Sequence, residues 1–375
     1  MSFDSRVSLE NSGALRGRRA AQRAAHAPGA AEDCWMVDRP EPVHVPVLAR
    51  ETIELLGGAH PESAEGWIID ATVGAGGHTR LLLEAMPGVC VLGLDQDPEI
   101  LEVAARNLEG FGDRVRLERV RMSELSRHLR KLALPAPIGW LCDIGASSLQ
   151  LDRPERGFSF MADGPLDMRM DPSRERTAAD IVNRWDETDL ADLIYHEGGE
   201  TRSRQIARAI CQDRRRAPFR RTGALAHCIA RALGSRGSGR LHPATLTFQA
   251  LRRAVNEEAE ELTAGLEAAQ LTLADGGVMC VISFHSGEDG HAKRFFKGGA
   301  SEGLWKILTK KPMRPSRDEE QANARARSAR LRAARRIRSQ GDSGAFEASG
   351  GKLGERSAYT LADDRPVGDG EEAVE

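Results

Sequence analysis

Short apolar runs alternate with helical patterns over the first part of the patterned sequence. The runs cover residues 67–70, 89–95, 115–120 and 138–143. Apolar positions with a helical period lie over residues 79–85 and 98–108, and Pro98 suits the first turn of the second helix. Because strands that alternate with helices are typical of a parallel, doubly wound sheet, we predict an α/β fold of that kind.

The pattern changes between about residue 149 and residue 242, where no strand-like apolar run occurs. Helices are predicted over residues 177–184, 187–195, 201–215 and 222–233. Thr177 and Thr222 are predicted N-caps. One long helix follows, with Thr245 as its N-cap and with a single apolar face. This face consists of Phe248, Leu251, Val255, Leu262 and Leu266.

Strand patterns return in the last part of the chain. A strand is predicted over residues 276–286, a helix over 288–296, and two final strands over 305–310 and 327–332. The simplest organisation is one sheet domain that is interrupted by a helical insertion. The predicted boundaries are residues 39–150 and 244–338 for the sheet domain, 151–243 for the insertion, and 1–38 and 339–375 for terminal extensions.

The two ends of the chain lack an apolar period. Residues 11–31 contain four arginines and no acid. An organelle transit peptide has such a composition, but so has a disordered extension, which we favour. Met36 is an alternative start of translation. Residues 340–375 carry three basic residues against nine acids, which predicts a disordered acidic tail.

The cysteines and the apolar runs bear on the compartment. The six cysteines show no CxxC spacing, and we expect reduced thiols and a cytoplasmic location. The longest apolar run, residues 278–284, is far shorter than the ~20 residues of a membrane-spanning helix. We therefore expect no membrane partner.

The net charge of −3 conceals two basic blocks. Residues 199–253 contain 13 arginines and two acids, and residues 304–338 contain 12 basic residues and three acids. A charge run is often only a solvated face. Blocks rich in arginine also favour a polyanionic partner, because the guanidinium group binds phosphate in a bidentate manner and stacks on bases.

A glycine-rich turn after the first strand carries the strongest chemical signal. It runs from Asp70 through Gly74, Gly76 and Gly77, and Asp95 ends the second strand 21 residues after Gly74. A carboxylate at that place accepts the ribose hydroxyls of an adenosine. A dinucleotide or S-adenosylmethionine would fit. A threonine replaces the third glycine of the dinucleotide pattern, which favours S-adenosylmethionine, and a purely structural turn is the alternative.

Further candidate residues follow the fourth and fifth strands. Asp143 ends the fourth strand, where it either contacts a ligand or caps a loop. Phe158 and Phe160 lie in a long loop and either stack on a base or pin the loop to the core. His285 ends the fifth strand and is either structural or part of the site. The spacing of Asp163, Asp167 and Asp171 is not that of an EF-hand, and we predict no metal.

Several segments are long and unusual enough to indicate a family. They are residues 44–48 (HVPVL), 74–78 (GAGGH), 94–97 (LDQD), 152–160 (DRPERGFSF), 163–171 (DGPLDMRMD), 242–245 (HPAT), 248–252 (FQALR), 283–286 (SFHS), 311–316 (KPMRPS) and 325–328 (RARS). With them, residues 44–337 resemble the bacterial 16S ribosomal RNA cytosine-N4 methyltransferase family. The family usually has a bulky residue such as phenylalanine at Met122, leucine at Gly287 and arginine at Gly290.

The resemblance implies a fold, a reaction and a set of site residues. It implies a class I S-adenosylmethionine-dependent methyltransferase sheet with an inserted all-helical domain for substrate recognition. It implies methylation of the N4 amine of a cytidine in the decoding centre of 16S rRNA, within the small ribosomal subunit. The implied cofactor contacts are Gly76, Gly77 and His78 at the methionine end, Asp95 at the ribose, and Met122, Asp143 and Gln150 around adenine and sulfonium.

The expected chemistry is an in-line displacement by the N4 amine, which is a poor nucleophile because its lone pair is delocalised into the ring. We expect the enzyme to align and desolvate the reactants and to accept a proton, with Asp143 as the hypothetical acceptor. An NAD(P)-dependent oxidoreductase is the alternative enzyme. An RNA-binding assembly factor without turnover is the alternative outside enzymes.

Overall fold

The computed structural model describes residues 46–58, 60–234 and 242–337. The predictions for residues 1–38, for Met36 and for the acidic tail at 339–375 lie outside these residues.

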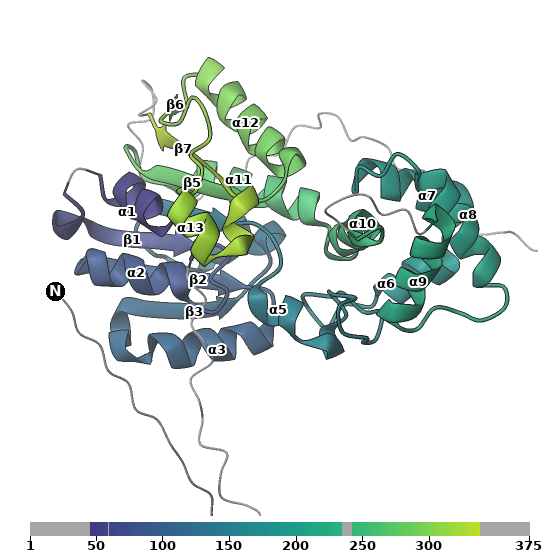
Figure 1. The fold of residues 1–375 in the computed structure, drawn as a ribbon. Helices are drawn as coiled ribbons and strands as arrows, with labels where there is room; N and C mark the ends of the chain where they lie inside the picture. The colour runs from purple at the N-terminus through teal and green to yellow at the C-terminus, as the bar shows by residue number, and fades with distance from the viewer. Residues whose placement is uncertain (1–45, 59, 235–241, 338–375) are drawn as a thin grey trace, which may run out of the picture. The chain divides into compact units, whose positions relative to one another are not determined.

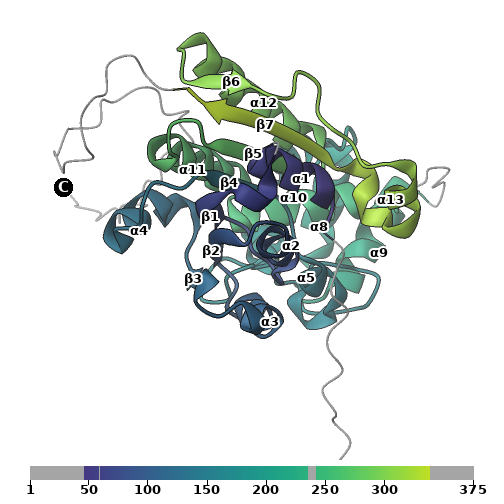
Figure 2. The ribbon, with the colours of Figure 1, turned by 90° about the vertical axis from the view of Figure 1, so that its left-hand side faces the viewer.

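A seven-stranded sheet forms the centre of the fold, with the strand order β3-β2-β1-β4-β5-β7-β6 (Figure 1). The strands are β1 (Glu65–Asp70), β2 (Gly88–Asp95), β3 (Val115–Arg119), β4 (Gly139–Asp143), β5 (Val278–Ser283), β6 (Trp305–Ile307) and β7 (Arg330–Arg336). Strands β1 to β5 pair in parallel, which confirms the predicted doubly wound sheet. Strand β7 pairs antiparallel with β5 and with β6, and Figure 2 shows β6 and β7 together at one edge of the sheet.

Helices cover both faces of the sheet because successive strand residues point to opposite sides. In β1, Ile68 packs with α1 (Ala49–Gly57) and α2 (Gly77–Ala85). The next residue, Ile69, packs with α4, α11 and α12 on the other face. These helices span Leu125–Leu132, Glu258–Thr272 and Ser286–Ser301. Helix α3 (Pro98–Leu108) packs beside β2 and β3.

The segment between β4 and β5 consists of helices and loops, with one isolated bridge, between Pro165 and Arg221, among its described residues. Its helices are α5 (Ser148–Asp152), α6 (Ala178–Arg184), α7 (Glu187–His196), α8 (Ser203–Asp213), α9 (Thr222–Leu233) and α10 (Thr245–Asn256), followed by α11. Residues from Leu166 to Val255 form a hydrophobic cluster of their own. Figure 1 shows α6 to α9 gathered in one group. That this segment is a substrate-recognition domain stays a prediction.

The remaining elements are short. They are α13 (Arg317–Ala322) and the 3-10 turns at Pro61–Ser63, Glu109–Arg114, Met122–Glu124, Pro154–Arg156 and Ala324–Ser328.

The long helix predicted after residue 245 is wrong, because the structure divides it into α10 and α11 at Glu257. This residue adopts a left-handed backbone conformation, with φ 52° and ψ 42°. Because of the break, the two halves of the predicted apolar face pack in two different hydrophobic clusters. Phe248, Leu251 and Val255 pack among the helices of the insertion, whereas Leu262 and Leu266 pack on the sheet.

Of the three predicted N-caps, one is confirmed and two are wrong. Thr177 caps α6 as predicted, in a reciprocal pair of hydrogen bonds with Asp180. Thr222 is the first helical residue of α9 and not its cap; its hydroxyl instead accepts from the Gly164 amide at 3.0 Å. Thr245 is likewise the first residue of α10, after Ala244. Strand β7 begins three residues later than the predicted range of 327–332.

Candidate active site

The turn between β1 and α2 is held by a buried carboxylate. Asp70 accepts hydrogen bonds from the Thr79 hydroxyl at 2.7 Å and from the Thr72 amide at 3.3 Å. Burial raises the pKa of Asp70 to about 6 in spite of these bonds. Asp70 therefore joins the end of β1 to the first turn of α2.

Glycine is required within this turn. Gly74 and Gly76 have φ values of 53° and 88°, in the left-handed region that other residues rarely adopt. A Cβ atom at Gly76 would lie 2.9 Å from the Leu108 side chain. No side chain caps α2 at Gly76, so the positive end of the helix dipole is offered to an anionic group.

We expect Gly76→Ala to destabilise the protein more than Gly303→Ala. Both glycines have positive φ, but a Cβ atom at Gly303, just after α12, has nothing within 4 Å. Gly303→Ala should lower the free energy of unfolding by about 1–2 kcal/mol through backbone strain alone. Gly76→Ala should cost about 1–3 kcal/mol more because the Leu108 side chain must move. Urea unfolding of both variants checks this, and equal losses would contradict it.

Asp95 lies against the glycine turn, as its spacing predicts. Its carboxylate accepts from the Gly74 amide at 3.2 Å and from the Asp97 amide at 3.0 Å. Burial raises its pKa to about 6. The two sequence features are thus in direct contact, and their role in holding a ribose stays a prediction.

Asp143 lies at the end of β4, between β1 and β5. Its backbone amide donates to the Thr72 hydroxyl at 2.6 Å, and its carboxylate Oδ2 is 3.6 Å from Nδ1 of His78. Burial, followed by the charges of Asp70 and Glu288, raises the pKa of Asp143 to about 8. The structure therefore brings Asp143 and His78 together with the carboxylate of Asp70.

Met122 and Gln150 have partners within the protein. The Met122 sulfur lies 3.9 Å from the Cys142 sulfur and packs so closely on α11 that a Cβ atom at Gly265 would lie 2.6 Å from it. The Gln150 amide nitrogen donates to Asp97 at 2.8 Å, and its oxygen accepts from the Ser147 amide at 2.9 Å. Gln150 thus joins α5 to the end of β2, and its contact with a cofactor stays a prediction.

Phe158 and Phe160 pack against other side chains of the protein. Phe158 is buried, with the Arg156 guanidinium 6.0 Å from its ring centre. The ring of Phe160 is 4.6 Å from that of His242 and 4.8 Å from that of Phe248. These contacts agree with the alternative that the two rings pin the loop to the core. Stacking of either ring on a base stays a prediction, and it would require these contacts to break.

His285 caps helix α12. Its Nδ1 accepts from the amides of Gly287 and Glu288, at 3.1 and 3.3 Å. Its Nε2 lies 2.7 Å from a carboxylate oxygen of Glu288. Burial alone would raise the pKa of Glu288, but the hydrogen bond and charge of His285 lower it overall. The geometry gives His285 a structural role, and its contact with a substrate stays a prediction.

The three candidate metal carboxylates each pair with a different arginine. Asp163 pairs with Arg221, Asp167 with Arg169, and Asp171 with Arg119. Within residues 46–58, 60–234 and 242–337, no group of three or more His, Cys, Asp or Glu residues is arranged to hold a metal. Among the same residues, no helix is both long and apolar enough to cross a membrane.

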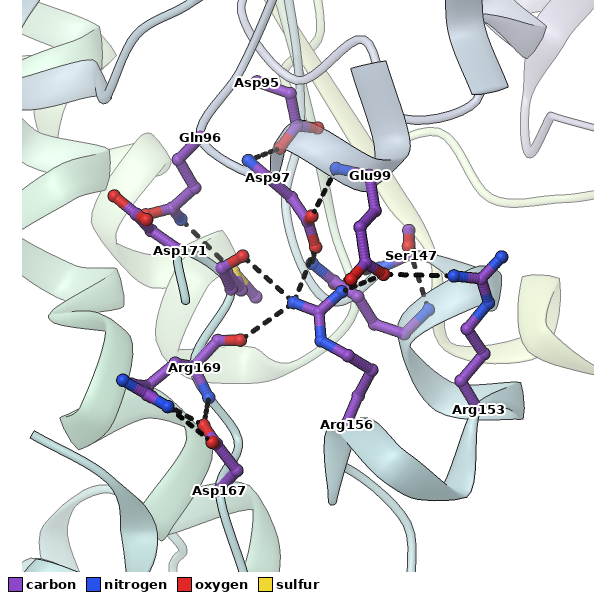
Figure 3. A network of polar contacts seen from close by, with 12 residues as sticks. Asp95, Gln96, Asp97, Glu99, Ser147, Arg153, Arg156, Asp167, Arg169 and Asp171 are labelled. Carbon is purple, nitrogen blue, oxygen red and sulfur yellow. Dashed lines mark hydrogen bonds and ion pairs between the residues drawn. The ribbon is translucent and has the colours of Figure 1, made fainter. Parts of the chain in front are cut away.

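A buried ion pair that no sequence pattern predicts organises this edge of the sheet (Figure 3). Asp97 is fully buried and accepts from Arg156 at 2.8 Å and from Gln150 at 2.8 Å. Its other oxygen accepts from the Glu99 amide at the start of α3. Arg156 also donates to the carbonyl oxygens of Arg169 and Met170, so the pair fixes the loop at 163–171 to the end of β2. An acid before Pro98 is a recognisable helix start, but nothing in the sequence indicates its arginine partner.

A second network joins the turn that carries Met122 to the break between α10 and α11. Arg121 pairs with Glu257 at 2.9 Å and with Glu261 at 2.6 Å, and Glu257 also pairs with Arg174. The adjacent Asn256 hydrogen-bonds the backbone of residues 168 and 170. The left-handed residue Glu257 therefore lies where the sheet, the loop and the insertion meet.

These features define the class of protein. A doubly wound sheet in this strand order, with a glycine turn after β1 and a carboxylate at the end of β2, is that of a class I S-adenosylmethionine-dependent methyltransferase. The chain belongs to the MraW methylase family, whose family model matches residues 41–337. The predicted fold class, family and cofactor are thereby confirmed.

Individual relatives agree with this assignment. The chain is 49% identical over 294 residues to the ribosomal RNA small subunit methyltransferase H of Sorangium cellulosum, covering 78% of this chain and 91% of that protein. It is 47% identical to the protein of the same name from Synechococcus elongatus, covering 78% and 95%. A solved rRNA methylase from Streptococcus thermophilus is 10% identical, with a TM-score of 0.38 over 81% of this chain and 99% of that one, and adds nothing to the assignment.

Proposed function

We propose that this enzyme methylates the N4 amine of a cytidine in the decoding centre of 16S rRNA, within the small ribosomal subunit. The observation that carries the proposal is the 49% identity to a small-subunit rRNA methyltransferase over nine-tenths of that protein's length. The cytosine amine as acceptor comes from the family resemblance of the sequence motifs. Asp143 at the end of β4 is compatible with it, since a carboxylate there can take a proton from an amine.

The residues at this edge of the sheet fit S-adenosylmethionine. The uncapped start of α2 at Gly76 and Gly77 suits the carboxylate of the methionine part, and Asp95 suits the ribose hydroxyls. Oδ1 of Asp143 is buried and has no hydrogen-bond partner within the described residues, which is the property of an atom that meets a ligand. His78, Met122 and Gln150 would complete the site. When bound, S-adenosylmethionine supplies a methyl group on a positively charged sulfur.

The chain's own contribution is alignment, exclusion of water and proton acceptance. Asp70 and His78 are buried and the Asp143 side chain is 25% exposed, so this edge of the sheet offers the reactants a site with little contact to bulk water. Fixed placement of an amine next to a methyl donor lowers the entropic part of the barrier. Asp143 is the proposed acceptor for the proton that the N4 amine loses.

The test is a comparison of modified nucleosides in small-subunit rRNA from cells with and without this protein, by mass spectrometry. We expect N4-methylated cytidine at the decoding centre only when the protein is present. Transfer of labelled methyl groups to purified small subunits distinguishes an enzyme from an assembly factor. Calorimetry that detects binding of NAD but not of S-adenosylhomocysteine would support an oxidoreductase instead.

Exposed arginines on α8 and in the segment between α8 and α9 support an RNA partner. Some arginines of the first basic block are exposed but paired with acids, such as Arg221 with Asp163 and Arg231 with Asp213. Others are exposed and carry positive charge on the surface of the insertion, namely Arg204, Arg215, Arg216 and Arg220. The second block is partly structural, since Arg332 is buried against Asp289.

Binding to rRNA should therefore fall steeply with salt. We expect the double variant Arg215→Ala, Arg216→Ala to weaken binding and to reduce the slope of log K against log salt by roughly one for each phosphate that the variant no longer binds. The matched control is Arg130→Ala, Lys131→Ala, which removes two exposed charges of α4 outside both blocks. Filter binding across a salt series measures both, and a salt-independent affinity would contradict the proposed phosphate contacts.

A further inference from the structure

The segment between α5 and α6 is a tightly packed loop that starts beside the end of β2. Arg156 pairs with Asp97 at 2.8 Å and donates to the carbonyl oxygen of Met170 at 3.1 Å, which ties the two arms of the loop to one place. Farther out the arms are in direct contact, since a Cβ atom at Gly164 would lie 1.7 Å from the carbonyl oxygen of Pro154. The loop therefore has a fixed shape.

The tip of this loop is pinned to the insertion on both sides of Met161. On one side, the ring of Phe160 packs edge-on against that of Phe248, with 4.8 Å between the ring centres. On the other side, the Asp163 carboxylate accepts from the Gly223 amide at 2.9 Å, near the start of α9. Turning Met161 inward would break these contacts, so the fold holds this residue where it is.

Met161 itself faces solvent. At 86% exposure it is the most exposed large apolar side chain among the residues that the structure describes. A single apolar side chain on a surface is common and needs no explanation by itself. Met161, however, is kept exposed by fixed neighbours, and it lies next to the first basic block. Arg221 pairs with Asp163, two residues from Met161, and the adjacent Arg220 is exposed. An apolar tip and positive charge therefore share one surface.

The proposed reaction requires a side chain of this kind. Oδ1 of Asp143 is buried, so the N4 amine reaches it only when the cytidine leaves its stack. Leaving the stack costs free energy and opens a gap beside the neighbouring base. Proteins that open a base step insert an apolar side chain, such as methionine, into the gap. Phe158 and Phe160 are less suited to this role, because both rings already pack on protein side chains.

We propose that Met161 inserts into the rRNA beside the target cytidine and stacks on the base that the cytidine leaves, while exposed arginines of the insertion bind the flanking phosphates. The inference rests on the proposed function and names the side chain that holds the target base out of its stack. Met161 is five residues from Arg156, so the Cα atoms of the two residues are at most about 18 Å apart. A thioether side chain is flexible and polarisable, and it therefore packs on a purine or on a pyrimidine.

The test compares Met161→Ala with wild type on two reconstituted small subunits that differ in one nucleotide of their rRNA. One subunit has the ordinary nucleotide beside the target cytidine. The other has an abasic nucleotide there, on which the cytidine cannot stack. On the ordinary subunit, we expect single-turnover methyl transfer at saturating enzyme to be roughly tenfold slower in the variant. On the abasic subunit, the variant should match the wild-type rate, because that stack is already open. Met161→Leu should keep most of the rate on both, since it retains an apolar side chain.

Leu271→Ala is the matched control and should leave both rates unchanged, because Leu271 is an exposed apolar residue of α11, outside the insertion. Equal slowing of Met161→Ala on both subunits would indicate a structural role and overturn the proposal, as would an unchanged rate on the ordinary subunit. If the variant only needs more enzyme for the same maximal rate, Met161 serves docking, for instance on a ribosomal protein, and the proposal is likewise overturned. Absence of methyl transfer by the wild-type protein would defeat the proposed function separately.

Discussion

Asp143→Asn should lower the rate of methyl transfer to the small subunit by about 10²–10⁴-fold. Asparagine has nearly the same shape, and the bond from the backbone amide of residue 143 to Thr72 does not involve the side chain. The amide cannot accept a proton, however. The measurement is single-turnover transfer at saturating cofactor, with calorimetry of S-adenosylhomocysteine to separate binding from chemistry. A full rate with normal cofactor affinity would show that Asp143 is not the acceptor.

The same variant should change how stability depends on pH. The pKa of Asp143 is raised from 3.8 to about 8 in the folded protein, so between these values the folded state holds a proton that the unfolded state has lost. The stabilisation from this proton is fully present below about pH 4 and is lost as pH rises through about 8. The asparagine side chain of the variant does not titrate. Urea unfolding at several pH values should therefore show Asp143→Asn gaining stability relative to wild type as pH rises, and a constant difference would contradict this.

Asp97→Ala should lower the free energy of unfolding by about 3–5 kcal/mol, because it leaves the Arg156 guanidinium buried without its carboxylate. Asp97 is fully buried and the Arg156 side chain is 9% exposed. A guanidinium nitrogen of Arg156 lies 2.8 Å from Oδ2 of Asp97. The variant also removes the cap of α3 and the partner of Gln150. Urea unfolding followed by circular dichroism measures the loss.

Glu99→Ala is the matched control for Asp97→Ala. Glu99 also pairs with Arg156, at 3.2 Å, but its side chain is 45% exposed. An exposed pair contributes about 1 kcal/mol or less because water already solvates the charge. If the two variants lose similar stability, the buried pair does not organise this edge of the sheet. We also expect Asp97→Ala, but not Glu99→Ala, to weaken cofactor binding, because the Asp97 carboxylate fixes the side chain of Gln150, a predicted cofactor contact, at 2.8 Å.

Strand positions could be predicted closely where burial on both faces makes a strand continuously apolar. Strand β5 is buried at every residue and lies within the predicted range. The predicted strand at 327–332 begins three residues before β7, because arginines and small apolar residues mix in the sequence of β7, RLRAARR, and give no clear apolar run. Its alanines and leucine are buried only because β5 and β6 flank it. An alanine side chain contributes little to an apolar pattern. The pairing with β5 and β6 therefore determines where strand β7 begins.

The helix break at Glu257 cannot be predicted from the apolar periodicity. The apolar spacing continues through the break and therefore predicts one helix. Glu257 is held in its left-handed conformation by Arg121 and Arg174, which are 136 and 83 residues away in the chain. Contacts between residues so far apart in the chain leave no local sequence pattern. They nevertheless determine in which hydrophobic cluster each half of the apolar face packs.

The sequence by itself determined the order of the strands along the chain, most of the helices, the glycine turn, the spacing of Asp95 and the family, because local patterns and short motifs encode these. Only the tertiary structure decided that Phe158 and Phe160 pack on protein side chains, that Asp97 pairs with Arg156, and that His78 lies between Val47 and Asp143. The physical reason is that burial and the hydrogen-bond partner of a side chain depend on segments that are distant along the chain. Folding brings these segments together at the carboxyl ends of the parallel strands.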